Sequence, residues 1–278
     1  MTRLLIGSEE HKARFCRVFV DTHDPYVPGE IRWPALDASA LTRLRALPFW
    51  GEAVVSERTA AARVRAMAAV EPDPMLREAI AMQAYEEERH AELLDRLLEH
   101  YTIPYPQHTV QAPADAEWGF VRMGYAECFD AFFAFGLFRV AADTGFFPPA
   151  LVELFDGVMQ EEARHILFFS NWAAHRRVRL SVVRKPWFLV RRLSGATIQA
   201  LGRVRTAAQL RDASATEGNF TLQVPEEIAD VTLHSLARTC VRENDCRLGR
   251  YDPDLLRPRI VPSLVGLALH FLPGSAAA

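Results

Sequence analysis

The chain has 278 residues, half of which are apolar, and a formal net charge of −3. This composition predicts one large globular domain, with or without an appendage, and the charge excludes a general attraction to nucleic acid. The first residues lack the apolar core of a signal peptide, and the most apolar late stretch, 260–272, is too short to span a bilayer. We therefore expect a cytoplasmic protein with no transmembrane segment.

Long segments rich in Ala, Leu, Arg and Glu predict an all-α protein, because the alternating apolar patterns of strands are scarce. Prolines and polar breaks divide the chain into a short N-terminal helix with a loop up to residue 34, a series of long helices and a short apolar helix at the end. The long helices are predicted at about 38–70, 75–101, 118–144, 150–179, 187–211 and 225–248. Pro48 is expected to kink the first of these or to start its main part.

The middle of the chain thus predicts two helical hairpins joined by a longer, proline-rich link. A four-helix bundle with one long crossover is the natural assembly of two such hairpins. We expect residues 38–180 to form this bundle. Residues 1–37 would add an N-terminal helix and loop, and residues 181–278 a C-terminal helical extension packed on the bundle.

One motif occurs in both hairpins, as YEEERH from Tyr85 and as QEEARH from Gln160. Each places a Glu three residues before a His, so Glu87 and His90 share one helix face, as do Glu162 and His165 on theirs. A single pair of this kind arises easily by chance. Two copies at an offset of 75 residues are harder to attribute to chance.

In each hairpin a further Glu precedes the motif Glu by 34 intervening residues: Glu52 in the first and Glu127 in the second. That spacing is about one descending helix, a turn and a return to the same height, so each hairpin should bring its two Glu residues level. Glu57 is the alternative to Glu52, but it lies on a different helix face and does not keep the 75-residue offset.

The two hairpins together would collect four carboxylates and two imidazoles, a set that suits two ions of iron or manganese. Four carboxylates would balance two divalent cations, whereas their burial without metal would be costly. The predicted metal ligands are Glu52, Glu87, His90, Glu127, Glu162 and His165.

This six-ligand pattern resembles that of the ferritin-like di-iron carboxylate superfamily, over about residues 40–180. The resemblance implies two iron ions, or manganese and iron, and an oxidase or oxygenase that uses O2 or peroxide on a small organic substrate with an external electron donor. It also implies the alternative of a non-catalytic metal-binding or ferroxidase-type protein. A further alternative is an interaction module in which the six residues form a metal-free polar core. The chain has no rubredoxin-like CxxC pair, which argues against a rubrerythrin.

Several neighbouring residues have two interpretations. Arg89 and Arg164 are expected to form ordinary helical ion pairs, with support of the ligand carboxylates as the alternative. One Glu of each motif should face solvent. Asp130 could be a further ligand, a hydrogen-bonding partner of one, or a polar group facing another helix.

Five phenylalanines follow Glu127, and most of them should belong to the core. They are Phe129, Phe132, Phe133, Phe135 and Phe138. A dry aromatic cavity beside the metals would protect reactive species, which favours an oxidase or oxygenase over a storage protein.

The remaining histidines are expected at the surface, and the cysteines are expected to stay reduced. His100, His108 and His175 are expected to be exposed. The four cysteines form no CxxC pair and are expected to be free thiols, with Cys128 in the core. They are Cys16, Cys128, Cys240 and Cys246.

Residues 163–211 contain ten Arg, one Lys and no acidic residue, mixed with Trp and Phe. A solvated face is the main interpretation. The alternative is an anionic partner, such as an acyl carrier protein, a substrate that carries coenzyme A or phosphate, RNA or a membrane surface. The last hundred residues could also cap the substrate pocket or form a homodimer interface.

Overall fold

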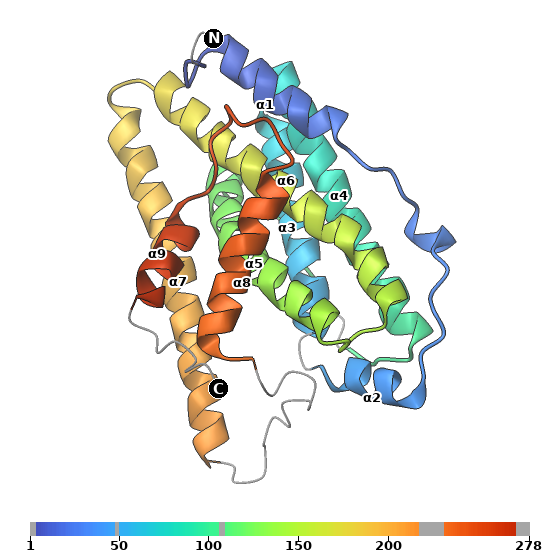
Figure 1. Cartoon of the computed structure of the whole chain (residues 1–278). Helices are drawn as coiled ribbons and strands as arrows, with labels where there is room; N and C mark the ends of the chain where they lie inside the picture. Colours follow the sequence, from blue (N-terminus) through green and yellow to red (C-terminus); the bar gives the residue numbers. More distant parts are fainter. Residues whose placement is uncertain (1–3, 48–49, 106–108, 217–230, 271–278) are drawn as a thin grey trace.

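Every regular element is a helix in the part of the chain that the computed structural model describes, residues 4–47, 50–105, 109–216 and 231–270 (Figure 1). The prediction of an all-α protein is thereby confirmed. The helices are α1 (Glu9–Asp21), the short 3-10 helix η1 (Pro28–Glu30), α2 (Ala38–Ala46), α3 (Trp50–Val70), α4 (Pro74–His100), α5 (Ala116–Asp143), α6 (Pro149–Arg179), α7 (Arg184–Thr216), α8 (Leu233–Leu248) and α9 (Ile260–Leu269).

Local sequence signals explain where these helices begin. The side chains of Ser8, Asp37, Asp73 and Asp115 accept hydrogen bonds from backbone N–H groups in the first turns of α1, α2, α4 and α5. The predicted helix 38–70 is divided into α2 and α3. Pro48, expected near this break, and Pro225, the predicted start of the last long helix, lie outside the described residues.

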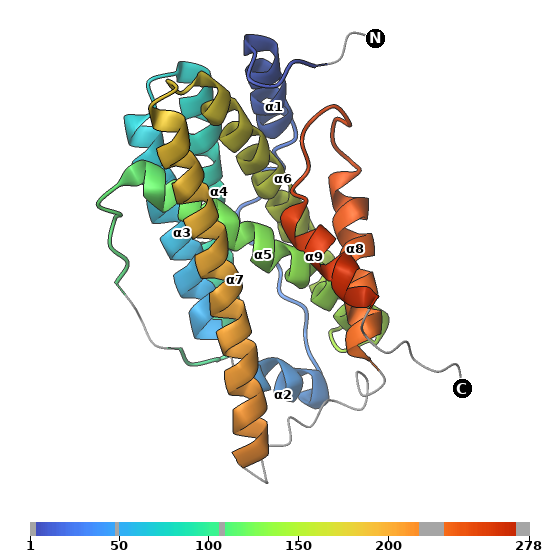
Figure 2. The ribbon, with the colours of Figure 1, turned by 90° about the vertical axis from the view of Figure 1, so that its left-hand side faces the viewer.

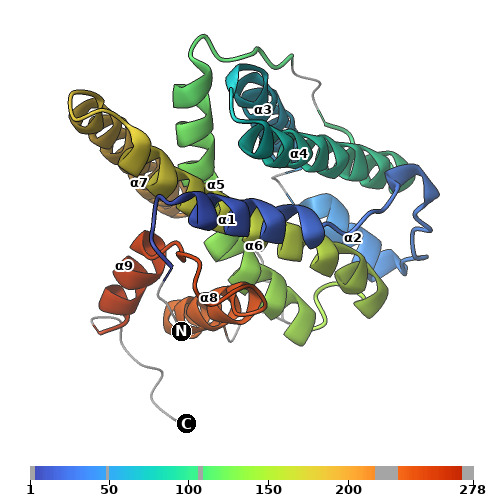
Figure 3. The same ribbon diagram turned by 90° about the horizontal axis from the view of Figure 1, so that it is seen from above.

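The helix α5 lies at the centre of the fold and packs against α3, α6, α7 and α8. The helices α3 and α4 lie side by side and form the most extensive helix contact (Figure 2). The helix α1 lies along α6 and also touches α4, so that it covers one side of these two helices (Figure 3). The largest core cluster joins apolar side chains of α1, α3, α4, α5 and α6. These five helices surround the functional site.

The phenylalanine-rich face of α5 binds the C-terminal helices rather than a cavity. Phe129 and Phe132 form a separate core cluster with Cys240 of α8 and Val261 of α9. The close approach of α8 depends on Gly136, where a Cβ atom would lie 2.2 Å from the Sγ atom of Cys240. No helix in the described ranges combines the length and apolarity needed to cross a bilayer.

All four cysteines are free thiols, as predicted, and Cys128 is buried in the core. His100 is exposed as expected, whereas His108 lies outside the described residues. The expectation of an exposed His175 is wrong, because this ring is buried beside Phe15 and His11 of α1. A long helix that is covered by a second helix hides polar positions that would otherwise face solvent.

Candidate metal centre

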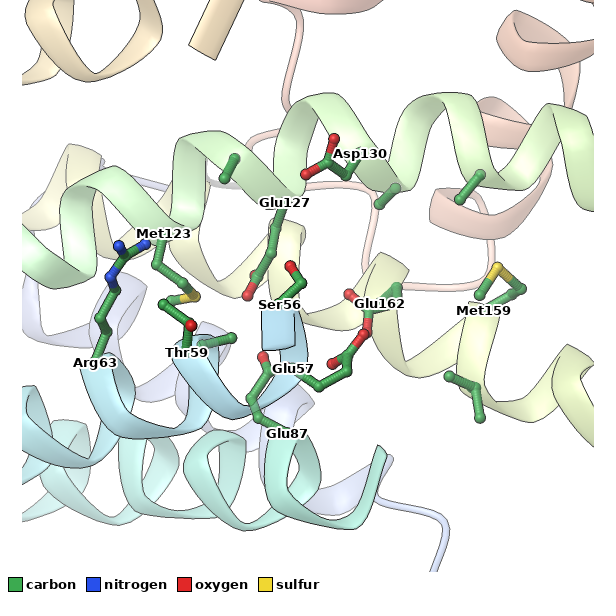
Figure 4. Close-up of a pocket in the computed structure, with 15 residues that line it drawn as sticks. Ser56, Glu57, Thr59, Arg63, Glu87, Met123, Glu127, Asp130, Met159 and Glu162 are labelled. Carbon is green, nitrogen blue, oxygen red and sulfur yellow. The ribbon is translucent and has the colours of Figure 1, made fainter. Parts of the chain in front are cut away.

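Four helices direct one carboxylate each toward a common point. Glu57 comes from α3, Glu87 from α4, Glu127 from α5 and Glu162 from α6, and Figure 4 shows these side chains pointing toward one another. Their oxygens form two groups with the histidines, in each of which the potential ligand atoms lie within 4.8 Å of one another. One group is Glu57, Glu87, His90 and Glu162, and the other is Glu87, Glu127 and His165.

Both histidines direct Nδ1 into this cluster. The Nδ1 atom of His90 lies 3.1 Å from Glu162 and 3.6 Å from Glu57. The Nδ1 atom of His165 lies 3.1 Å from Glu87 and 3.7 Å from Glu162. Both nitrogens are buried and have no well-aligned hydrogen-bond partner. Ring nitrogens that face carboxylate oxygens without a hydrogen bond are suited to binding a shared cation.

The other ring nitrogens hold the histidines in place through the opposite helix. Nε2 of His90, on α4, lies 2.8 Å from Glu161 of α6. Nε2 of His165, on α6, lies 2.9 Å from Glu86 of α4. The two contacts are reciprocal, and each fixes the ring so that Nδ1 faces the cluster. Carboxylates in this position commonly orient metal-binding histidines and make them more basic.

Two buried arginines complete this outer layer. Arg89 donates a hydrogen bond to Glu161, and Arg164 donates one to Glu86, so each arginine again reaches across to the other helix. Arg164 also donates to the backbone carbonyl of Phe19, at 3.1 Å. The N-terminal helix therefore closes the arginine–glutamate layer from outside.

The expectation of an ordinary helical ion pair is thus wrong for Arg89. It is confirmed in part for Arg164, which lies 3.7 Å from Glu161 on its own helix, but both arginines also support the carboxylates that hold the histidines. The expectation of one exposed Glu in each motif is confirmed only for the first motif. There, Glu88 is exposed and pairs with Arg65. In the second motif Glu161 is buried and Glu162 is half-buried.

The arginines also reduce the need for a cation in the outer layer. His23, Glu86 and Glu161 lie close enough to hold an ion. Burial would raise the pKa of Glu86, but the hydrogen bond and charge of His165 and the charge of Arg164 lower it to about 2. Two guanidinium groups already balance Glu86 and Glu161, so this layer needs no metal cation.

The inner cluster has an unbalanced set of carboxylates. Burial, with the charges of Glu87 and Glu162, raises the pKa of Glu127 well above its usual value. Burial likewise raises the pKa of Glu57 to about 7, although His90 opposes this. For His90, burial disfavours the charged ring, but the contacts of its ring nitrogens with Glu161, Glu162 and Glu57 outweigh burial and raise the pKa. Crowding and burial thus favour the binding of positive charge at this cluster.

The structure does not bring Glu52 to the cluster. Glu52 is exposed, whereas Glu57 lies 3.6 Å from His90 and occupies the place predicted for Glu52. The 75-residue offset assumed equal turns in both hairpins. In fact, three residues connect α3 to α4 and five connect α5 to α6, so the two hairpins do not share one spacing, and this difference accounts for part of the five-residue shift. The other five predicted residues are all at the cluster.

Sequence reasoning also missed Gln83. Its buried Nε2 atom lies 3.2 Å from Glu87 and 3.4 Å from Glu127, so it bridges two carboxylates of the cluster. The available signal was its position four residues before Glu87, which places both on one helix face.

A pocket of about 260 Å³ opens beside the carboxylates. Its lining includes Glu57, Glu87, Glu127 and Glu162 together with Ser56, Thr59, Ala60, Arg63, Met123, Ala126, Asp130, Ala131, Ala134, Val158 and Met159 (Figure 4). The pocket is therefore next to the cluster and largely apolar elsewhere. Asp130 lines this pocket with an exposed side chain and belongs to none of the groups that could bind an ion.

The expected phenylalanine lining is wrong. No phenylalanine is among the residues that line this pocket in the described part of the chain. The helical repeat places alanines on the face of α5 that carries Glu127, and places Phe129 and Phe132 on the face that binds α8. The pocket remains open instead because small and flexible side chains line it.

The basic stretch 163–211 does not form one uniform positive face, because acidic residues elsewhere in the chain pair with several of its arginines. Arg176 pairs with Glu117 and Arg191 with Asp115. Arg164 is buried against Glu86. The excess positive charge of this stretch is thus partly neutralised by acidic side chains from other parts of the chain.

Comparison with protein-family models, curated proteins and solved structures finds no match for the chain. Its function is therefore argued from the site.

Proposed function

We propose that the chain is a ferritin-like protein that binds two iron ions, or manganese and iron, and oxidises a small organic substrate with O2 or peroxide. The observation that carries this proposal is the convergence of two buried, unpartnered imidazole nitrogens on four carboxylates from four helices. In this proposal α3, α4, α5 and α6 are the four helices of the bundle.

The donor set supports two ions. One ion would be held by Glu57 and His90, the other by Glu127 and His165, and Glu87 is close enough to serve both. Carboxylates and imidazoles favour iron and manganese over metals that select thiolates.

The charges are also consistent with two ions. Four carboxylates would balance two divalent cations once the histidine protons have left. Glu162, which lies near Nδ1 of both histidines, is a second residue able to bridge.

The residues of the proposed centre have different roles. Iron would supply the electron-transfer chemistry that activates the oxidant. The glutamates would set the charge of the centre, and Glu161 and Glu86 would hold the two histidine rings in place. Electrons for repeated turnover would come from an external donor.

The neighbouring pocket favours oxidation of an organic substrate over iron storage. Its apolar residues include Met123, Ala131, Val158 and Met159. Small-molecule sites are typically apolar hollows with a few well-placed polar groups, and this pocket has that composition next to the cluster. An entry route for iron ions would instead need a wetter, more polar path.

Metal analysis after anaerobic loading with Fe(II) tests the proposal. The wild type should hold about two ions per chain, and a Glu87→Ala/Glu162→Ala variant should hold fewer than half as many. A metal-free wild type after loading would contradict the proposal and favour a metal-free polar core.

Oxygen consumption then separates the two metal-binding functions. An oxygenase or oxidase should consume additional O2 and convert an organic compound when a suitable one and a reductant are present. A ferroxidase would consume O2 only in proportion to added Fe(II), whatever organic compound is offered.

A further inference from the structure

One end of the pocket carries positive charge that the fold does not neutralise. Figure 4 shows Arg63 and Met123 at one end, Met159 at the other, and the carboxylates between them. Arg63 lies on α3, six residues after Glu57, which corresponds to about 9 Å along the helix axis. The guanidinium is therefore inside the pocket but beyond the cluster.

Arg63 has no carboxylate partner within the described ranges, unlike its neighbours on the same helix. Arg58 pairs with Asp95 at 2.6 Å, and Arg65 pairs with Glu88. The side chain of Arg63 also lies close to α5, 3.5 Å from the position of a Cβ atom at Gly119, and Arg122 follows Gly119 by three residues on that helix. Burial, and then the charge of Arg122, lower the pKa of Arg63.

Arg122 has no acidic partner among the described residues either, and its Nε atom is buried without a hydrogen bond. Two half-buried cations side by side are unfavourable unless an anion lies between them or in front of them. The apolar and small side chains that line the rest of this end provide no anion. No acidic side chain among the described residues supplies the missing charge, and this favours the binding of an anion at this end of the pocket.

We propose that Arg63, with Arg122 behind it, binds the carboxylate of the substrate, which is an organic acid with an apolar body. This inference rests on the proposed function, because it concerns the substrate of the same pocket. An arginine fork matches a carboxylate through two parallel hydrogen bonds. The pocket volume of about 260 Å³ favours a compact acid over a molecule that carries a nucleotide.

The charges also fix the orientation of such a substrate. In the metal-loaded protein the two divalent cations would balance the four carboxylates of the cluster, whereas the positive charge of Arg63 would attract an anionic group. The acid group would thus lie at the Arg63 end, and the apolar body would extend past Met123 and Ala126 toward Glu57 and Glu127. The carbon to be oxidised would be several bonds from the carboxylate.

Calorimetric titration of the metal-loaded protein tests the proposal with matched probes: octanoate and 4-phenylbutyrate, each against its primary amide, and octyl phosphate. At least one acid should bind, with its amide and octyl phosphate at least tenfold weaker. Arg63→Gln should weaken binding of the acid at least tenfold and leave the metal content unchanged. Arg65→Gln, on the exposed side of the same helix, should change neither.

Equal affinity for acid and amide would overturn the proposal. So would full retention of affinity in Arg63→Gln, or failure of both acids to bind at 10 mM. A phosphate that bound more tightly than either acid would replace the carboxylate with a different substrate class.

Arginine footprinting separates failure of this inference from failure of the metal centre, because it does not require metal. Phenylglyoxal modification of Arg63, followed by peptide mass spectrometry, should be slowed at least threefold by the acid and not by its amide. Arg65 should react at the same rate in both. Absence of protection in a protein that holds two metal ions would reject the carboxylate site alone.

Discussion

His90 and Glu161 connect α4 to α6 through a contact of 2.8 Å between Nε2 and Oε2. The same relationship recurs between His165 and Glu86 in the opposite direction. Each motif therefore supplies a glutamate and a histidine for the cluster, a second glutamate that orients the other motif's histidine, and an arginine that donates to the other motif's orienting glutamate. The two Glu–Glu–x–Arg–His stretches function as one interlocked unit, and neither is complete alone.

Removal of one arginine from this unit should destabilise the protein strongly. Arg164→Met leaves Glu86 buried without its guanidinium, and breaking a buried ion pair in this way costs about 3–5 kcal/mol. Urea unfolding of the metal-free variant should show this loss. The matched change Arg65→Met removes an exposed pair with Glu88 and should cost less than about 1 kcal/mol. Equal losses of stability in the two variants would show that the buried arginine–glutamate pair contributes no more than the exposed pair.

The two candidate glutamates of α3 allow a direct test of the corrected ligand set. Glu57→Gln removes a charge 3.6 Å from His90 and should lower metal occupancy by about one ion per chain. Glu52→Gln changes an exposed side chain and should leave occupancy unchanged. Metal analysis after identical loading distinguishes them. Loss of metal in Glu52→Gln with retention in Glu57→Gln would restore the original ligand prediction.

The sequence was sufficient for the helices and for most of the cluster, because helix breakers and the three-residue Glu–His spacing are local signals. It was insufficient for features that depend on the spacing of the two helices in a hairpin. The 75-residue offset required the same spacing in both hairpins, but Glu57 and Glu87 are 30 residues apart whereas Glu127 and Glu162 are 35 apart, and the connections 71–73 and 144–148 account for two of these five residues.

Contacts between helices that are far apart in the sequence could not be predicted either. Arg89 pairs with Glu161 rather than with a neighbour on its own helix, and only the packing of α4 near α6 makes that choice. The phenylalanines after Glu127 were assigned to the wrong neighbour for the same reason. The apolar face of α5 was evident, but its partner, α8, follows about a hundred residues later.

The burial of His175 predicts a pH dependence of stability. Burial, followed by the nearby charges of His11 and Lys12, lowers its pKa from 6.5 to about 4. Glu9 acts in the opposite direction, and Arg179 again lowers the pKa. Between these two pH values the unfolded chain binds a proton that the folded chain does not, so stability should fall as the pH decreases from about 6.5 to about 4.

His175→Asn should remove this contribution. Urea unfolding of the metal-free proteins at pH 7 and pH 4.5 should show that the variant loses less stability than the wild type on acidification, by an amount on the order of 2 kcal/mol. The comparison cancels the pH dependence of groups common to both proteins. Parallel curves for the two proteins would mean that His175 is protonated in the folded state.

The contact between α5 and α8 predicts opposite effects for two glycine substitutions in helices. At Gly136 a new Cβ atom would lie 2.2 Å from Sγ of Cys240 and 2.9 Å from its backbone N and Cα atoms, so α8 must move. Gly136→Ala should therefore destabilise the protein by about 1–3 kcal/mol, the usual cost of overpacking. The backbone atoms of α8 cannot rotate away as a flexible side chain would.

Gly157→Ala is the matched control, because this glycine lies within α6 and nothing approaches within 4 Å of the position of its Cβ atom. It should stabilise the protein by roughly 0.5–1 kcal/mol, since alanine favours a helix over glycine. Thermal and urea unfolding of both variants measure the difference. A stabilised Gly136→Ala would show that α8 is not held closely against α5, and that the C-terminal helices are free to separate from the helices of the carboxylate cluster.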